Sequence, residues 1–216
     1  MDNFQEMISQ AWMLFDDKRY DDARDVYIQC HKNISKDDLA AEASVYMGLT
    51  YVEAFSGNYD LARDYANKLR SLATNEEDRH IYLHQLGMVE RMAENYETAL
   101  SVFVDEENII KAAFSDGYDR LSANMYEQGY VNYKMGNLSN ATKLMENAVM
   151  LGKQSGDAMC LACAYRGMGE ILAALDNGTG AKEYFQKSME EFKQAEDYKG
   201  MQEVEEMMYA IENCLL

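Results

Sequence analysis

Two pairs of side chains have types and spacings that could support chemistry. His80 and His84 are four residues apart in a segment with helical periodicity, a spacing that can place two imidazoles on one metal ion. No third ligand is evident, although acidic residues lie one turn before the first histidine. Cys160 and Cys163 form a lone C-x-x-C pair, without the second pair of a zinc site or the strand-to-helix setting of a redox motif. We therefore expect surface histidines and buried, small apolar cysteines, and we predict no metal and no cofactor.

Signatures of the common enzyme classes are missing from the sequence. It contains no Gly-rich phosphate loop, no nucleophile elbow and no dinucleotide fingerprint. Paired carboxylates occur throughout because 38 of the 216 residues are acidic, so no single pair is informative. We predict that the protein is not an enzyme.

The charge balance limits the classes of partner. The formal net charge is −18, from 38 acidic and 20 basic residues, and such a surface repels phosphate backbones and anionic lipids. We therefore predict no direct binding to nucleic acid or membranes; a basic or apolar partner fits better, although solubility alone also explains the acidity. No stretch has the roughly 18 to 20 apolar residues of a membrane span, and the N-terminus lacks the basic start of a signal peptide. We expect a cytoplasmic protein, because its four cysteines form no disulfide framework.

A pattern of small and apolar residues recurs at intervals of 39, 37, 42 and 40 residues. A period in this range is typical of a helical repeat array. The anchor alanines are Ala23, Ala62, Ala99, Ala141 and Ala181. The residues four positions after the anchors are Tyr27, Ala66, Phe103, Met145 and Phe185. The residues twelve positions before them are Ala11, Thr50, Gly87, Gly129 and Gly169, where a small side chain would let two helices approach closely. Between these positions, pairs such as Gly136 and Asn137 indicate a turn from one helix into the next.

This arrangement resembles the tetratricopeptide repeat, in which a Gly-x-Tyr-x-x-Ala turn joins helix A to helix B. The resemblance covers residues 3–195 and is strong around Gly87 and Gly129. The first repeat departs from it because Lys18 replaces the turn glycine, and the fifth because Gly178 replaces the turn aromatic. No proline closes the repeats, and they exceed the family's usual length of about 34 residues. These features are similar to those of the long-repeat branch, which includes bacterial regulators that bind signalling peptides.

The resemblance implies an all-α fold: a right-handed α-α superhelix of about five helix pairs plus a C-terminal capping helix, in a single domain over residues 1–216. We place the repeats at residues 3–34, 36–74, 76–114, 118–154 and 157–195, and the capping helix at 197–216. The apolar stripe of the last helix consists of Met201, Val204, Met208, Ile211 and Leu215. Capping the array is its expected role. A dimer contact is the alternative because Met207, Leu215 and Leu216 offer further apolar groups, so monomer and homodimer both stay open.

In tetratricopeptide arrays the A helices line the concave surface, so the resemblance implies that A-helix side chains not used in packing bind the ligand. Carried over repeat by repeat, the candidates are Trp12, Met47, Tyr51, Phe55, His84, Met88, Arg91, Tyr126, Tyr130, Tyr133, Lys134 and Arg166. Neighbouring positions of the same face hold Ile8, Phe15, Ile81, Met92 and Glu170. Aromatic and methionine side chains suit an apolar peptide or helix, and the three cations could hold a carboxylate. Alternatively, the aromatics pack between repeats, in which case about half of the set is buried.

We therefore expect an intracellular module that binds a protein or peptide ligand, an apolar or basic segment, on its concave face. A regulatory peptide sensor is the narrower expectation. Such regulators usually carry an N-terminal effector domain, whereas the first repeat here begins close to Met1, which argues against direct DNA binding. The alternative is a structural adaptor that oligomerises or scaffolds an assembly through its terminal helix or convex face.

Overall fold

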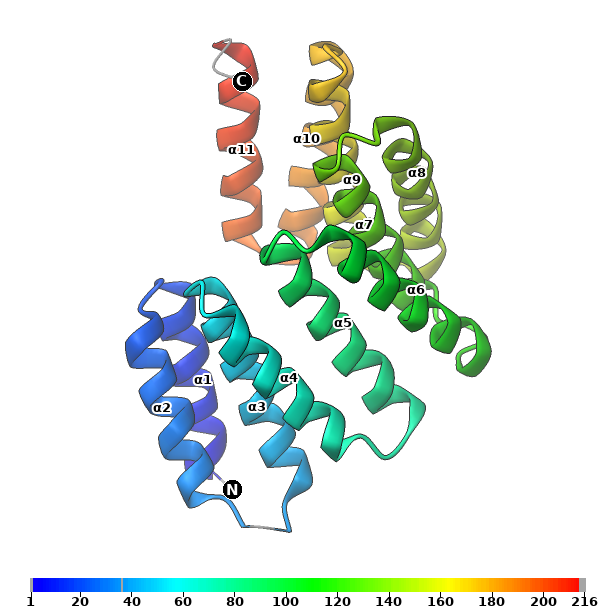
Figure 1. Cartoon of the computed structure of the whole chain (residues 1–216). Coiled ribbons are helices and arrows are strands. Elements are labelled where there is room, and N and C mark those ends of the chain that lie inside the picture. The colour runs from blue at the N-terminus through cyan, green and yellow to red at the C-terminus, as the bar shows by residue number, and fades with distance from the viewer. Residues whose placement is uncertain (1, 36, 214–216) are drawn as a thin grey trace. The chain divides into compact units, whose positions relative to one another are not determined.

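The computed structural model of the protein describes residues 2–35 and 37–213, without the side chains of residues 2, 3 and 212. The described residues form eleven α-helices and no strand, which confirms the all-α fold class (Figure 1). The helices are α1 Asp2–Asp16, α2 Tyr20–Asn33, α3 Leu39–Phe55, α4 Tyr59–Leu72, α5 Glu76–Met92, α6 Tyr96–Ala113, α7 Tyr118–Lys134, α8 Leu138–Ser155, α9 Ala158–Ala174, α10 Gly178–Gln194 and α11 Tyr198–Glu212. None of these helices is long and apolar enough to cross a lipid bilayer.

The chain divides into two compact units, Met1–Val102 and Phe103–Leu216, and the boundary falls within α6. In the first unit α1 pairs with α2 and α3 with α4, and α5 packs on α3 and α4. In the second unit α7 pairs with α8 and α9 with α10, and α11 packs on α10. Alternate helices also contact each other within a unit, as α1, α3 and α5 do, and as α7 and α9 do. We call α1, α3, α5, α7 and α9 the A helices and the helix after each its B helix. The single-domain organisation stays a prediction.

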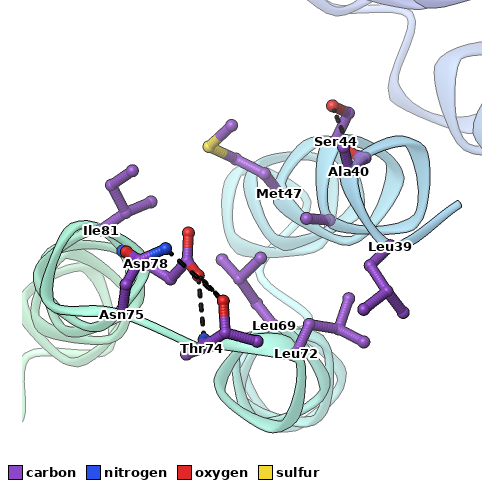
Figure 2. A pocket seen from close by; sticks show the side chains of 12 residues that line it. Leu39, Ala40, Ser44, Met47, Leu69, Leu72, Thr74, Asn75, Asp78 and Ile81 are labelled. Carbon is purple, nitrogen blue, oxygen red and sulfur yellow. Dashed lines mark hydrogen bonds between the residues drawn. The ribbon is translucent and has the colours of Figure 1, made fainter.

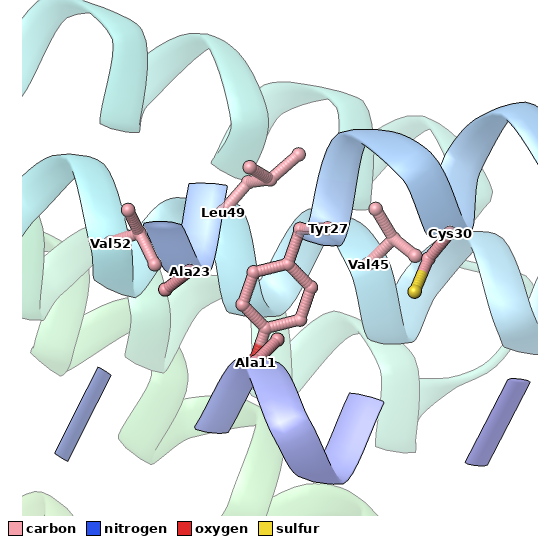
Figure 3. Packing of buried hydrophobic residues seen from close by; sticks show 7 residues of the cluster. All are labelled: Ala11, Ala23, Tyr27, Cys30, Val45, Leu49 and Val52. Atoms are coloured by element: carbon pink, nitrogen blue, oxygen red, sulfur yellow. The ribbon is translucent and has the colours of Figure 1, made fainter. Parts of the chain in front are cut away.

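The five anchor alanines lie at the most crowded positions of the B helices. Each is 0 % exposed, and the residue four positions later is buried in every repeat. In the first unit Tyr27 of α2 points toward Ala11 of α1, and Val45 and Leu49 of α3 complete the cluster (Figure 3). A methyl group at the anchor allows the helices to approach, and the side chain one turn later fills the space between them; it is large in four repeats and is Ala66 in the second. The periodic pattern therefore marks the core.

Aromatic rings lie directly against glycine backbone, most closely at Gly48 and Gly169. A Cβ atom on Gly48 would come within 2.2 Å of the Tyr27 ring, and one on Gly169 within 2.5 Å of the Phe185 ring. Gly169 is one of the small positions expected from the repeat. In the second repeat the expected small residue is Thr50, which is buried, but the close approach occurs two residues earlier at Gly48.

Each turn from an A helix to its B helix contains one residue in the left-handed conformation, five positions before the anchor. It is glycine at Gly57 and Gly136, with φ of 78°. The same conformation occurs without glycine at Lys18, Glu94 and Asp176, with φ of 59–60°. A side chain at such a position costs roughly 1–2 kcal/mol. The replacement of the turn glycine in the first repeat therefore changes the energy of the turn and leaves its geometry intact.

Three A helices begin at a capping side chain. Asp38, Asn75 and Asp157 cap α3, α5 and α9, because each side chain accepts a hydrogen bond from the backbone N–H three residues later. Helix length explains part of the long interval between the third and fourth anchors, since α6 has 18 residues where α4 has 14. Four extra residues add about one helical turn. α8 also has 18 residues, so the longer connection at 114–117, before α7, supplies the rest.

Two buried carboxylates of the first unit join an A helix to the preceding B helix. Arg24 of α2 donates to Glu53 of α3 at 2.5 Å, and Arg63 of α4 donates to both oxygens of Glu90 of α5 at 2.7 and 2.9 Å. The turn asparagines four positions before the anchors, Asn58 and Asn95, each donate to the same carboxylates at 2.8 Å. These asparagines therefore also satisfy a buried charge, a role that the repeat pattern does not reveal.

The last helix covers the end of the second unit. Val204 of α11 is fully buried in a cluster with Phe185 and Phe192 of α10. Met201, Met208 and Ile211 pack against that cluster, in agreement with the predicted capping role. Met207, one of the apolar groups that suggested the alternative dimer contact, packs there as well. Leu215 and Leu216 lie outside the described residues.

Candidate functional site

All twelve candidate binding residues lie on A helices and keep some exposed surface. Phe55 and Lys134 are exposed, and the other ten are half-buried. The expectation that about half of the set is buried is therefore wrong: the fully buried positions of these helices belong to other faces.

In the first unit the candidate aromatics form one cluster. The ring of Trp12 on α1 lies 5.5 Å from that of Tyr51 on α3, and Phe15 lies 5.1 Å from Phe55, both edge to face. Trp12 and Phe15 are themselves 5.5 Å apart. Tyr20 of α2 joins the cluster 5.6 Å from Phe15; the sequence treated it only as a turn residue. The A-helix face of this unit is thus a continuous, partly exposed aromatic surface.

The aromatic cluster extends to α5 through the hydroxyl of Tyr51. Gln85 donates to that hydroxyl at 3.3 Å, and the hydroxyl donates to the sulfur of Met88 at 3.9 Å. His84 and Arg91 lie on the same helix and are half-buried. Met88 is therefore joined to the aromatic candidates by a direct contact.

A pocket of about 340 Å³ opens between α3, α4 and α5 (Figure 2). Its walls include Met47 and Ile81, which the repeat resemblance assigned to the concave face. The remaining lining is Leu39, Ala40, Ala43, Ser44, Leu69, Leu72, Ala73, Thr74, Asn75 and Asp78. Met47 and Ile81 each lie one turn before a residue of the Tyr51–Gln85 contact, so the pocket continues the aromatic surface along the same two helices.

The polar edge of the pocket is already hydrogen-bonded. Asp78 accepts from the backbone N–H of Thr74 at 2.9 Å and from its hydroxyl at 3.0 Å. Asn75 in turn accepts from the Asp78 N–H. These contacts leave the apolar wall as the surface open to a ligand. The sequence missed Leu69 and Leu72 as lining residues, although they continue the anchor stripe into the last turn of α4.

In the second unit three tyrosines of α7 stand in a row. Tyr126 stacks on Tyr130 with ring centroids 6.1 Å apart, and Tyr130 lies 5.9 Å from Tyr133. The ammonium of Lys134 lies 5.9 Å from the centre of the Tyr130 ring. Burial raises the pKa of Tyr126 and of Tyr133 above the ordinary value, so both phenols stay neutral and can donate hydrogen bonds.

The remaining candidate, Arg166 of α9, is paired within the unit. Its Nη1 donates to Glu203 of α11 at 3.0 Å, and its Nε lies 3.9 Å from Glu170. Burial lowers the pKa of Arg166, but neighbouring Tyr126, Glu170 and Glu203 outweigh it and raise the pKa above its usual value. The sequence did not predict Glu203 as part of this site, because it lies on the helix assigned to capping.

The surroundings of the histidine pair and of the cysteine pair do not support the metal or redox chemistry that their spacing suggested. The His80 side chain is 13 % exposed, so the expectation of surface histidines is wrong, and its Nε2 lies 3.8 Å from Glu77. Over the described residues, no three His, Cys, Asp or Glu side chains gather in a way that could hold a metal ion. Cys160 and Cys163 are half-buried, and burial raises their pKa to about 12 and about 11. Both thiols are therefore protonated at neutral pH.

Comparison with known proteins identifies the fold. No family model and no curated protein matches the chain by sequence. Solved structures do match it, among them a signal transduction ATPase from Pyrococcus horikoshii with a tetratricopeptide repeat sensor, at a TM-score of 0.67 and 17 % identity. The fold is tetratricopeptide-like. That match covers 94 % of this chain and 31 % of the ATPase chain, so this chain spans about a third of that protein.

Two further matches are to PlcR and RapI. PlcR from Bacillus thuringiensis, solved with the peptide PapR7 and DNA, matches at a TM-score of 0.71 and 12 % identity, over 94 % of this chain and 74 % of PlcR. RapI in its apo form matches at 0.66 and 17 % identity, over 90 % of this chain and 72 % of RapI. At these identities the matches establish the tetratricopeptide-like fold, in agreement with the repeat resemblance.

Proposed function

We propose that the protein is a binding module that holds an apolar peptide or protein segment on its A-helix faces and that it has no enzymatic role. The observation that carries the proposal is the open pocket of about 340 Å³ between α3, α4 and α5, together with the aromatic surface that continues it. A concave, mainly apolar pocket with few polar groups is the usual form of a ligand site. An apolar side chain of the ligand would enter between Met47 and Ile81, and its neighbours would lie on Tyr51 and Trp12.

The comparison with PlcR supports this proposal. PlcR has the same fold and was crystallised with a peptide, PapR7, and with DNA. A regulatory peptide sensor is accordingly the narrower proposal for this chain. The net charge of −18 predicts that this chain does not bind nucleic acid directly.

A selection from a random library tests the proposal. Displayed dodecapeptides would be selected on the immobilised full chain and sequenced, and the affinity of the recovered peptides would then be measured for wild type and two variants. Met47→Glu introduces a charge into the pocket, and Asn67→Glu introduces the same charge at an exposed position of α4. We expect peptides rich in apolar residues that bind wild type and Asn67→Glu equally. They should bind Met47→Glu at least about tenfold more weakly, because a buried carboxylate must be desolvated.

Two results would contradict the proposal: recovery of no enriched peptide, or equal binding to Met47→Glu and Asn67→Glu. Circular dichroism of both variants checks that each remains folded. In this design the charge added to the protein is the same in both variants, so a loss confined to Met47→Glu reports on the pocket rather than on net charge.

An adaptor role is the second candidate, and the outer side of α11 favours it. Tyr198 and Tyr209 are 62 % and 63 % exposed, and their spacing of eleven residues places them on one side of the helix. Sedimentation equilibrium distinguishes the roles. An adaptor that self-associates through α11 would show a mass that rises with concentration and falls back when both tyrosines are replaced by serine.

A further inference from the structure

Arg166 of α9 uses only part of its hydrogen-bonding capacity within the second unit. Its side chain is 23 % exposed and donates a hydrogen bond through Nη1 to Glu203. Its Nε atom is buried and forms no hydrogen bond with any group that the structure describes, since Glu170 at 3.9 Å is beyond bonding distance. A guanidinium presents a fork that fits both oxygens of a carboxylate at once. The contact with Glu203 uses one arm of that fork.

Of the two carboxylates beside Arg166, Glu203 is the one that a ligand could replace. It is 47 % exposed, whereas Glu170 is 14 % exposed. α11 is held by its apolar stripe, in which Val204 is fully buried, and Glu203 lies beside that stripe. A rotation of the Glu203 side chain toward solvent would uncover Arg166 without detaching α11 from the core.

The surroundings of Arg166 suit the end of a peptide. Tyr126 lies close enough to influence its charge and, with Tyr130 and Tyr133, supplies a row of aromatic surface along α7. An incoming carboxylate would take the position that the Glu203 carboxylate leaves when it turns toward solvent. One negative charge then still faces the guanidinium, so Glu170 opposes the ligand no more than it opposes the pair already present.

We propose that Arg166 is a carboxylate subsite for the ligand and that Glu203 occupies it in the free protein as a built-in competitor. The inference rests on the proposed function, because it assigns the carboxylate to a bound peptide. That carboxylate is either the C-terminus of the peptide or an acidic side chain next to an apolar residue. The aromatic row then receives the adjacent side chain.

The test uses small probes and the full chain. N-acetyl-leucyl-phenylalanine carries a free C-terminal carboxylate, its amide carries none, and N-acetyl-glutamyl-phenylalanine amide carries one only in a side chain. Each would be titrated into ¹⁵N-labelled protein while the Arg166 Nε–Hε resonance and the backbone amide of Gly200 are followed by NMR. We expect the first probe to shift both signals, the plain amide to shift neither, and the glutamyl probe to show whether a side-chain carboxylate is also accepted.

Four variants distinguish competition by Glu203 for Arg166 from a general effect of net charge on binding. Glu203→Gln should bind the first probe about fivefold more tightly than wild type, because a partly exposed ion pair no longer competes. Glu205→Gln makes the same charge change at an exposed position of α11 and should bind as wild type does. Arg166→Gln should abolish binding. Arg166→Lys keeps the positive charge but lacks the forked guanidinium, so it should bind the first probe more weakly than wild type. This conservative variant keeps the inference testable if Arg166→Gln fails to fold.

Three outcomes would overturn the inference: equal affinity of Glu203→Gln and wild type, equal binding of the acid and the plain amide, or no binding of the acid to either protein. None of them bears on the pocket of the first unit. If the selected peptides bind wild type and not Met47→Glu, the proposed function stands even where the Arg166 subsite is refuted.

Discussion

Replacing Arg63 by methionine should destabilise the first unit by about 2–4 kcal/mol. Arg63 donates to both oxygens of Glu90, whose side chain is 8 % exposed. The change therefore leaves a buried carboxylate that still accepts a hydrogen bond from Asn95 of the turn. Breaking a buried ion pair by removing one partner costs about 3–5 kcal/mol. Arg63 itself is 27 % exposed, and water reaching the vacated space reduces the expected cost to about 2–4 kcal/mol.

The loss should depend on pH in a defined direction. The hydrogen bond from Arg63 lowers the pKa of Glu90, burial opposes it, and Asn95 adds to it. Because the folded pKa lies below the unfolded value of about 4.3, the stabilisation from this carboxylate is complete above that value and is lost as the pH falls through the folded pKa. The difference between wild type and Arg63→Met should therefore be largest near neutral pH and should shrink below about pH 4.

Urea unfolding followed by tryptophan fluorescence measures this effect locally. Trp12 is the single tryptophan of the chain and lies in the unit that contains Arg63. Arg79→Met is the matched control, because Arg79 pairs with Glu76 three residues earlier and both side chains are about half exposed. Such a surface pair contributes about 0–1 kcal/mol. If Arg63→Met lost no more stability than Arg79→Met, or lost as much at pH 3.5 as at pH 7, the assignment of a buried pair would be refuted.

Two further predictions concern packing and thiol reactivity. Gly48→Ala should destabilise the chain by about 1–3 kcal/mol, because the new methyl group would lie 2.2 Å from the ring of Tyr27. A methyl group on Gly167 would lie 2.3 Å from Cε and 2.7 Å from Sδ of Met145, and 3.3 Å from the Tyr126 ring. Because a methionine can change rotamer whereas the Tyr27 ring is rigid, Gly167→Ala should lower the thermal unfolding midpoint less than Gly48→Ala does; equal midpoints for the two variants would contradict the packing account. Cys160 and Cys163, with pKa values near 12 and near 11, should react with iodoacetamide at pH 7 at least roughly 100-fold more slowly in the folded chain than in urea. Mass spectrometry of the alkylated peptides would show this, and rapid labelling of either cysteine in the folded chain would contradict it.

The periodic features of the fold could be predicted because each repeat obeys the same local rule. The anchor alanines and the buried residues one turn later follow from spacing over a few residues, and the structure confirms them. The left-handed turns at Lys18 and Glu94 could not be recognised by composition, since the repeat imposes that conformation on residues that do not favour it.

The candidate site was predicted less completely, for a physical reason. Assigning residues to the A helices found Met47, Tyr51 and Trp12, because one face of a helix follows from spacing alone. The pocket wall from the end of α4 was missed, because it depends on how three helices diverge at their ends. The pairing of Arg166 with Glu203 was missed because the two residues are 37 positions apart and meet only when α11 packs on the last hairpin.

The sequence by itself determined the all-helical class, the number and phase of the repeats, and the helix faces that carry core side chains, because these follow from helical periodicity and local turn chemistry. Only the tertiary structure decided which glycine receives the Tyr27 ring, which carboxylates are buried against arginine, and where an open pocket remains. Such features depend on distances between segments far apart in the chain, and spacing along one helix contains no information about those distances.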